Sequence, residues 1–163
     1  MKHTPRLVLI ALLLQGLAAL AHAEGNPYDD AVHVYGCADY PKALKLFIPL
    51  AEQGDRLAQF QVGMMIEQGQ GTDPSLAQAF DWYLKAAQKG VADAYFALGQ
   101  IYSRGEVVAK DPVQAYAWFD LAMKGGHAVA GDWLRKESSR LKPEELPKAE
   151  IIVAEWLNKF KKP

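Results

Sequence analysis

An internal repeat is the feature that most constrains the fold of this chain. Gly54, Gly90 and Gly126 are spaced 36 residues apart, and the two windows between them match at many other positions. A fixed period of this length is typical of repeat architectures, in which each unit packs on the next. The residues that return at the same register are Ala58, Gly63, Gly69, Ala79, Trp82, Tyr83 and Ala86, which become Ala94, Gly99, Gly105, Ala115, Trp118, Phe119 and Ala122.

Each window contains two apolar stripes with helical spacing, so each repeat is predicted to be two amphipathic helices joined by a loop. The stripe of the first helix consists of Val62, Met65 and Ile66 in one window and of Leu98, Ile101 and Tyr102 in the other. Gly63 and Gly99 lie inside that helix, where glycine costs about 1 kcal/mol relative to alanine. This indicates that a neighbouring helix passes too close for a side chain. Trp82 and Trp118 share a register and are predicted to belong to the core of their repeats.

The loop inside each window carries helix stop and start signals. Gly69-Gln70-Gly71 is suited to end a helix, and Thr72-Asp73-Pro74 offers a cap with proline in the first turn of the next one. Gly105 and Lys110-Asp111-Pro112 have the same function in the second window, although Val107 replaces the second glycine.

This pattern resembles the Sel1-like repeat (SLR), a relative of the tetratricopeptide repeat. The resemblance rests on Ala58, Val62-Gly63, Ile66, Gly69-Gln70-Gly71, Ala79, Trp82-Tyr83, Lys85-Ala86-Ala87 and Gly90. It covers roughly residues 28–138. It implies an all-α fold, a right-handed α-solenoid of helix-turn-helix repeats that works as an adaptor, with no chemistry of its own in most members.

The start of the chain is predicted to be a cleaved secretory signal peptide over residues 1–23. Lys2 and Arg6 precede an apolar run from Leu7 to Leu20, and Ala21-His22-Ala23 offers a cleavage site. An uncleaved membrane anchor is the alternative, but the run is shorter than the roughly 20 residues that a span needs. We therefore expect a periplasmic protein without stable membrane insertion after signal cleavage, and secretion outside the cell stays open.

The mature chain is expected to be a single α-solenoid domain over residues 24–163. It divides into an opening tetratricopeptide-like hairpin at 28–54, repeat 1 at 55–90, repeat 2 at 91–126, and a degenerate repeat with a C-terminal capping helix at 127–163. Cys37 is the only cysteine, so no disulfide within the chain can form, and a disulfide-linked dimer through Cys37 is less favoured than a free thiol. The formal net charge of −1 gives no electrostatic case for binding nucleic acid.

No catalytic motif is found, so a non-enzymatic protein without cofactor or metal is expected. The chain has no H-E-x-x-H, no G-x-S-x-G and no phosphate-binding glycine loop. His33 and His127 are predicted to be surface or capping residues. Two other functions stay open: a hydrolase acting on cell-wall material or a β-lactam, with a polar catalytic cluster in the groove, and a carbohydrate-binding module, with exposed tryptophan or tyrosine platforms.

A partner protein or peptide is expected to bind on the first helix of each repeat, because the resemblance implies that these helices line the concave side. The predicted partner-binding residues lie opposite the core stripe and are Leu57, Phe60, Met64, Glu67, Asp93, Phe96, Gln100, Ser103 and Asp132. Phe60 and Phe96 would form an apolar floor and the acidic residues a rim. The alternative is that these rings pack against neighbouring helices and do not reach the solvent.

Overall fold

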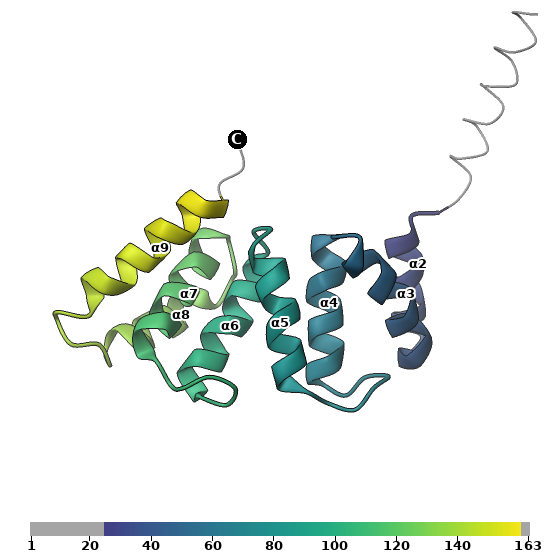
Figure 1. The fold of residues 1–163 in the computed structure, drawn as a ribbon, viewed down its shortest axis with the longest axis horizontal. Helices are drawn as coiled ribbons and strands as arrows, with labels where there is room; N and C mark the ends of the chain where they lie inside the picture. Colours follow the sequence, from purple (N-terminus) through teal and green to yellow (C-terminus); the bar gives the residue numbers. More distant parts are fainter. Residues whose placement is uncertain (1–24, 161–163) are drawn as a thin grey trace, which may run out of the picture.

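The computed structural model describes residues 25–160, and this part of the chain forms eight α-helices (Figure 1). The predicted signal peptide lies outside the described residues. The helices are α2 (Pro27–Gly36), α3 (Tyr40–Glu52), α4 (Arg56–Glu67), α5 (Leu76–Ala87), α6 (Ala92–Arg104), α7 (Pro112–Lys124), α8 (Ala130–Ser138) and α9 (Leu146–Phe160). None of these helices is both long and apolar enough to cross a membrane.

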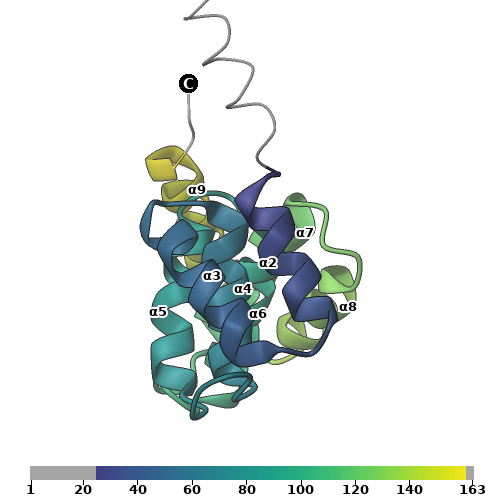
Figure 2. The ribbon, with the colours of Figure 1, turned by 90° about the vertical axis from the view of Figure 1, so that its right-hand side faces the viewer.

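From α2 to α8, each helix packs against the one that follows it in the chain. Figure 1 shows the resulting linear array, and Figure 2 looks onto its α2–α3 end. The period of 36 residues corresponds to the hairpins α4–α5 and α6–α7. The predicted all-α, solenoid-like fold is confirmed.

The two glycines inside the first helices mark close contacts with aromatic rings of the second helices. A Cβ atom added to Gly63 would lie 2.8 Å from Cε1 of Tyr83, and one added to Gly99 would lie 2.7 Å from Cδ1 of Phe119. Real Cβ atoms do not approach other atoms this closely, so any larger residue would force the ring away. The cost of glycine in these helices is therefore offset by closer packing of the hairpin.

The helix caps confirm one loop prediction and correct the other. In repeat 2, the Asp111 carboxylate accepts hydrogen bonds from the amides of Val113 and Gln114, and Pro112 begins α7. In repeat 1, the cap of α5 is Ser75 and not Thr72 or Asp73. Ser75 lies 36 residues before Asp111, so the repeat register places the cap, and the local Asp-Pro pair does not.

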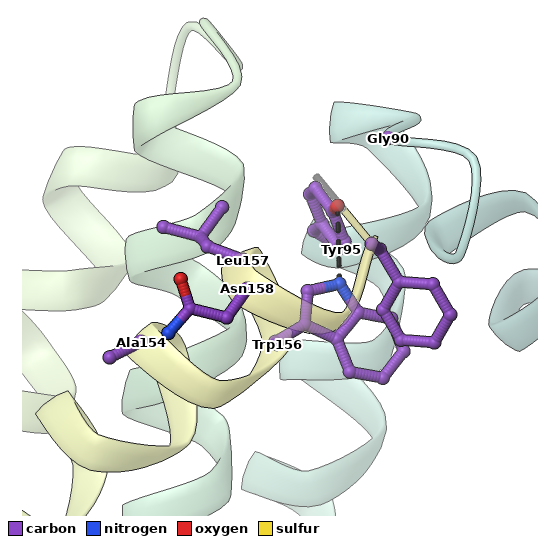
Figure 3. A pocket seen from close by; sticks show the side chains of 7 residues that line it. Gly90, Tyr95, Ala154, Trp156, Leu157 and Asn158 are labelled. Atoms are coloured by element: carbon purple, nitrogen blue, oxygen red, sulfur yellow. Dashed lines mark hydrogen bonds between the residues drawn. The ribbon is translucent and has the colours of Figure 1, made fainter. Parts of the chain in front are cut away.

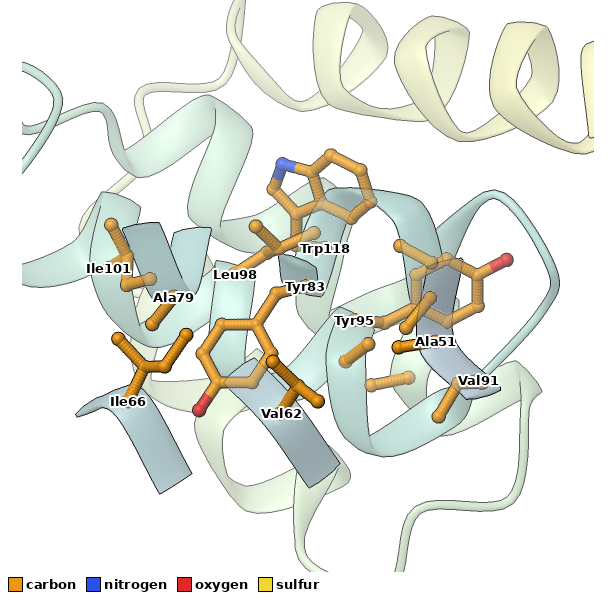
Figure 4. Close-up of a cluster of buried hydrophobic side chains, with 14 of the residues drawn as sticks. Ala51, Val62, Ile66, Ala79, Tyr83, Val91, Tyr95, Leu98, Ile101 and Trp118 are labelled. Carbon is orange, nitrogen blue, oxygen red and sulfur yellow. The ribbon is translucent and has the colours of Figure 1, made fainter. Parts of the chain in front are cut away.

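The hydrophobic core consists of buried apolar side chains from all the helices and continues from one hairpin to the next. Figure 4 shows Val62, Tyr83, Leu98 and Trp118 among the buried apolar side chains that join repeat 1 to repeat 2. Many alanines of the helices are completely buried. Burial of apolar surface between neighbouring units therefore holds the array together.

The last helix folds back over the array and does not extend it. α9 packs mainly on α7, two helices earlier in the chain. Its Trp156 ring lies 4.6 Å from the Trp118 ring, between centroids, and its indole Nε1–H donates a 3.2 Å hydrogen bond to the Tyr95 hydroxyl. The array therefore has a cap that covers the side of repeat 2.

The packing of α9 gives Trp82 and Trp118, which share a register in the repeats, different degrees of burial. Trp118 is buried under α9, with 5% of its surface exposed, whereas Trp82 is only partly buried and is covered by the Lys85 ammonium, 3.8 Å from its ring centroid. The position of Lys85 is occupied in repeat 2 by the buried Leu121. The prediction that both tryptophans are core residues is thus confirmed for Trp118, whereas Trp82 packs at the edge of the core and stays partly exposed, because α9 packs on α7 and not on α5.

Candidate functional site

The predicted partner-binding residues lie on α4, α6 and α8, the first helices of their units, and form two separate groups. The α4 group consists of Leu57, Phe60, Met64 and Glu67; the second group consists of Asp93, Phe96, Gln100 and Ser103 on α6 and Asp132 on α8. No ring pair, hydrogen bond or ion pair within residues 25–160 joins the α4 group to the α6 residues. A partner that used both groups would therefore have to span two repeats.

On α4, the residues form an apolar stripe beside one polar contact. Leu57 is 45% exposed, and Phe60 and Met64, three and seven positions later, are partly buried. This spacing places the three side chains on one face of the helix. The Phe60 ring packs on the Tyr83 ring at 5.7 Å between centroids, so one side of Phe60 belongs to the hairpin and the other continues the stripe.

Glu67 ends the stripe and binds a buried tyrosine. The Tyr83 hydroxyl donates a 2.5 Å hydrogen bond to Oε2 of Glu67. Burial, together with this bond to the carboxylate and its negative charge, raises the pKa of the Tyr83 phenol above its ordinary value of 10.0. Tyr83 therefore stays a neutral donor at physiological pH, and Glu67 has a structural contact in addition to any contact with a partner.

On α6, Phe96 lies inside an aromatic cluster. Its ring stacks on the His127 ring at 4.0 Å, meets the Trp133 ring edge-on at 5.8 Å and packs on the Phe119 ring at 5.4 Å. Trp133 and His127 were not predicted to be part of this surface. The only signal in the sequence was their position just after Gly126, where the repeat starts again.

The side chain of His127, predicted to be a surface or capping residue, is largely buried in the structure. Its side chain is 16% exposed, and its Nε2 lies 3.6 Å from the Asp93 carboxylate, which is itself 60% exposed. A flat ring stacked on Phe96 excludes water from one face, which accounts for this burial. Phe96 is therefore shared between the core and the surface.

The remaining predicted residues differ in their exposure. Asp132 has a 70% exposed side chain and forms an ion pair with Arg135 on the same helix. Gln100 is partly buried on α6. The acidic rim therefore consists of carboxylates that already have partners on the chain: Glu67 with Tyr83, Asp93 with His127 and Asp132 with Arg135.

The structure corrects the predicted site at Ser103, which is buried, with 8% of its surface exposed, and is not available to a partner. Its hydroxyl donates a 2.5 Å hydrogen bond to Oε1 of Glu137 on α8, which is completely buried. Nη1 of Arg140 donates a second bond of 2.7 Å to the same oxygen. The helix wheel of α6 alone could not show this, because Glu137 comes from the following unit.

No group of three His, Cys, Asp or Glu residues with the geometry to hold a metal ion occurs within residues 25–160. Cys37, at the end of α2, is exposed as a free thiol.

Comparison with known proteins decides the family. The profile of the Sel1 repeat matches residues 38–55, 56–91 and 92–127, which together make up more than half of the chain. The protein belongs to the Sel1 repeat family. The predicted resemblance is confirmed, and the match also includes the second part of the opening unit, residues 38–55.

Two solved structures show the same arrangement of Sel1 repeats. The crystal structure of a protective antigen present in uropathogenic Escherichia coli strains, described as displaying an SLR fold, is 29% identical, with a TM-score of 0.76 over 82% of this chain and 30% of that one. The crystal structure of a Sel1 repeat protein from Oxalobacter formigenes is 30% identical, with a TM-score of 0.61 over 64% of this chain and 43% of that one. The chain thus spans less than half the length of either protein. No curated protein matches it.

Proposed function

We propose that this Sel1 repeat protein is a non-enzymatic adaptor or regulator that binds a peptide or protein segment on its first helices. The family supports this, because Sel1 repeats are typical of protein-interaction scaffolds. The observation that carries the proposal is the apolar stripe of α4, in which the 45% exposed Leu57 continues into the partly buried Phe60 and Met64. An amphipathic helix or an extended peptide would bury this stripe on binding.

The binding surface we propose is narrower than the nine predicted residues. Ser103 is excluded by its burial, and Phe60 and Phe96 are each anchored on a ring of the second helix. Leu57 and Met64 on α4 and the exposed Asp93 and Asp132 stay open to contact. Leu57 and Met64 would contribute to binding by removing their apolar surface from water.

Export to the periplasm is the second part of the proposal, and it rests on the signal sequence at residues 1–23. Lys2 and Arg6, the apolar run and the small residues before Glu24 support it. Fractionation of cells expressing the full chain, with N-terminal sequencing of the product, tests it. We expect a periplasmic product that begins at Glu24; an intact N-terminus in the cytoplasm would contradict the proposal.

The experiment that tests binding is affinity capture from a periplasmic extract with the wild type and with the Leu57→Asp/Met64→Asp variant. This variant is preferred over substitution of Phe60 and Phe96, because those rings also pack against the second helices. Ile151→Asp is the matched control, since Ile151 is a 56% exposed apolar residue on α9. We expect partners to be lost only with the α4 variant. Retention of all partners would place the binding surface elsewhere.

A further inference from the structure

A groove between α9 and the turns that connect the repeats is a second surface with the features of a binding site. Two adjacent hollows of about 490 Å³ and 430 Å³ share Gly90 and Phe160 as lining residues. Both volumes lie within the range of roughly 300–1,000 Å³ found for ligand pockets. The turn at Gly90 leaves open space above its backbone, because an added Cβ there would meet nothing within 4 Å.

The first hollow is aromatic. Figure 3 shows Tyr95, Trp156 and Leu157 around it, with the Trp156 indole hydrogen-bonded to the Tyr95 hydroxyl. The hydroxyl accepts this bond, and burial raises the pKa of Tyr95, so its own proton stays available for an acceptor. This hollow therefore fits a large apolar side chain with a hydrogen-bond acceptor beside it.

The second hollow is cationic. Its lining includes Arg56 and Lys89, and neither forms an ion pair with an acidic side chain of residues 25–160. Nζ of Lys89 donates a 2.7 Å hydrogen bond to the carbonyl oxygen of Gly54, which holds this cation at the groove. The one carboxylate of the lining, Asp55, already accepts hydrogen bonds from the amides of Leu57 and Ala58.

From this arrangement we infer that the groove binds an acidic peptide segment that carries a large apolar side chain next to its carboxylates. The apolar side chain enters the hollow beside Trp156 and Phe160, and the carboxylates pair with Arg56 and Lys89. Charge complementarity favours this occupant, because a basic or neutral segment would leave both cations unpaired. The net negative charge of the rest of the protein acts weakly here, since salt screens exposed charges beyond about 8 Å at physiological ionic strength.

This groove is separate from the α4 stripe of the proposed function. Its lining comes from the turns between the repeats, from α9, from Arg56 at the start of α4 and from Tyr95 on α6, and it does not include Leu57, Phe60 or Met64. A partner could therefore use both surfaces, or two partners could bind at once.

The test is fluorescence anisotropy with the labelled peptide Gly-Ser-Asp-Glu-Phe-Glu-Asp-Gly as the probe. Two further peptides are compared with it: one with all acidic residues replaced by their amides, and one with Phe replaced by Ser. We expect the acidic peptide to bind roughly tenfold more tightly than either, and its affinity to fall as salt is raised. Absence of binding, or equal binding of the amide peptide, would overturn the inference.

Protein variants locate the site. We expect the Arg56→Glu/Lys89→Glu variant to bind the acidic peptide with roughly tenfold lower affinity. Lys42→Glu/Lys45→Glu, which reverses two exposed charges on α3, should leave its affinity unchanged. Because Lys89 also bonds the turn at Gly54, Arg56→Glu alone is measured as well, and circular dichroism verifies folding. The alternative site is the α4 stripe, which the Leu57→Asp/Met64→Asp variant tests. If this variant lost binding and the Arg56 and Lys89 variants kept it, the peptide would occupy the α4 stripe. The groove assignment would then be wrong, and the proposed function would stand.

The indole N–H signal of Trp156 gives a direct readout in a nitrogen-15 correlation spectrum, with Trp156→Phe to assign it. We expect the acidic peptide to shift this signal and to leave that of Trp82 in place, because Trp82 lies on α5 outside the groove. A peptide that shifted the Trp82 or Trp133 signal and not that of Trp156 would contradict the assignment.

Discussion

The hydroxyl of Tyr83 donates a 2.5 Å hydrogen bond to Glu67 across the α4–α5 hairpin. The second repeat replaces this pair by Phe119 and Ser103, which cannot bond to each other in the same way. Ser103 binds Glu137 of the following unit instead. One position of the repeat thus makes a contact within its hairpin in one copy and a contact between units in the next.

Loss of the Tyr83 hydroxyl is expected to destabilise the protein moderately. Tyr83→Phe removes the hydrogen bond and leaves Glu67, which is partly buried, without its donor. We expect the free energy of unfolding in urea to fall by about 1–2 kcal/mol. Glu67→Gln keeps an acceptor at this position and should cost less. Equal stability of Tyr83→Phe and the wild type would show that the bond contributes nothing.

Alkaline pH should lower the free energy of unfolding of the wild type more than that of the Tyr83→Phe variant. The folded state raises the pKa of Tyr83 above 10.0, so the stabilisation is complete below about pH 10 and is lost as the pH rises above it. Between the pKa values of the unfolded and folded states, one such group changes the free energy of unfolding by about 1.4 kcal/mol per pH unit. Urea unfolding at pH 9, 10 and 11 measures this. An identical pH dependence of the two proteins would contradict the account of Tyr83.

Substitution of the glycine inside α6 should cost stability through a steric clash. The Cβ of Gly99→Ala would lie 2.7 Å from the Phe119 ring, which is completely buried and also packed against Phe96 and Trp133. We expect a loss of about 1–3 kcal/mol in the free energy of unfolding. Gly36→Ala is the matched control, because a Cβ at Gly36 would meet nothing within 4 Å. A neutral or stabilising effect of Gly99→Ala would show that the helices can move apart at no cost.

The equivalent tryptophans should respond unequally to truncation. Trp118→Ala opens a cavity beneath α9 and is expected to cost about 3–5 kcal/mol. Trp82→Ala should cost less than half of that, because the ring packs at the edge of the core and stays partly exposed. Thermal unfolding of both variants measures the difference. Equal losses would mean that α9 adds no burial at Trp118.

The features that could be predicted from the sequence are those set by the repeat register. The helix pairs, the close approach at Gly63 and Gly99 and the family all follow from residues that return 36 positions later. The incorrect predictions concern contacts with residues outside the register. The helix wheel of α6 predicts an exposed Ser103, because Glu137 comes from the following unit. The register predicts equal burial of Trp82 and Trp118, because nothing local shows that α9 packs on Trp118 and leaves α5 uncovered.

The candidate site was predictable in position and less so in detail. The period placed Leu57, Phe60 and Met64 on one face of a first helix, and the structure shows them there. The stacking of His127 on Phe96 depends on how α8 approaches α6 after Gly126, where the repeat pattern weakens. The packing of α9 on the array includes the hydrogen bond of Trp156 to Tyr95, 61 positions earlier in the chain. The period of 36 residues does not predict a contact at this separation.

Photo-cross-linking in living cells tests the proposed adaptor function most directly. A photoreactive phenylalanine analogue is introduced in place of Leu57 and, in a separate variant, in place of Ile151, the exposed apolar residue on α9. We predict a defined cross-linked protein product from position 57 and none from position 151. Equal or absent cross-linking at the two positions would contradict the assignment of the α4 stripe as the surface that binds a partner.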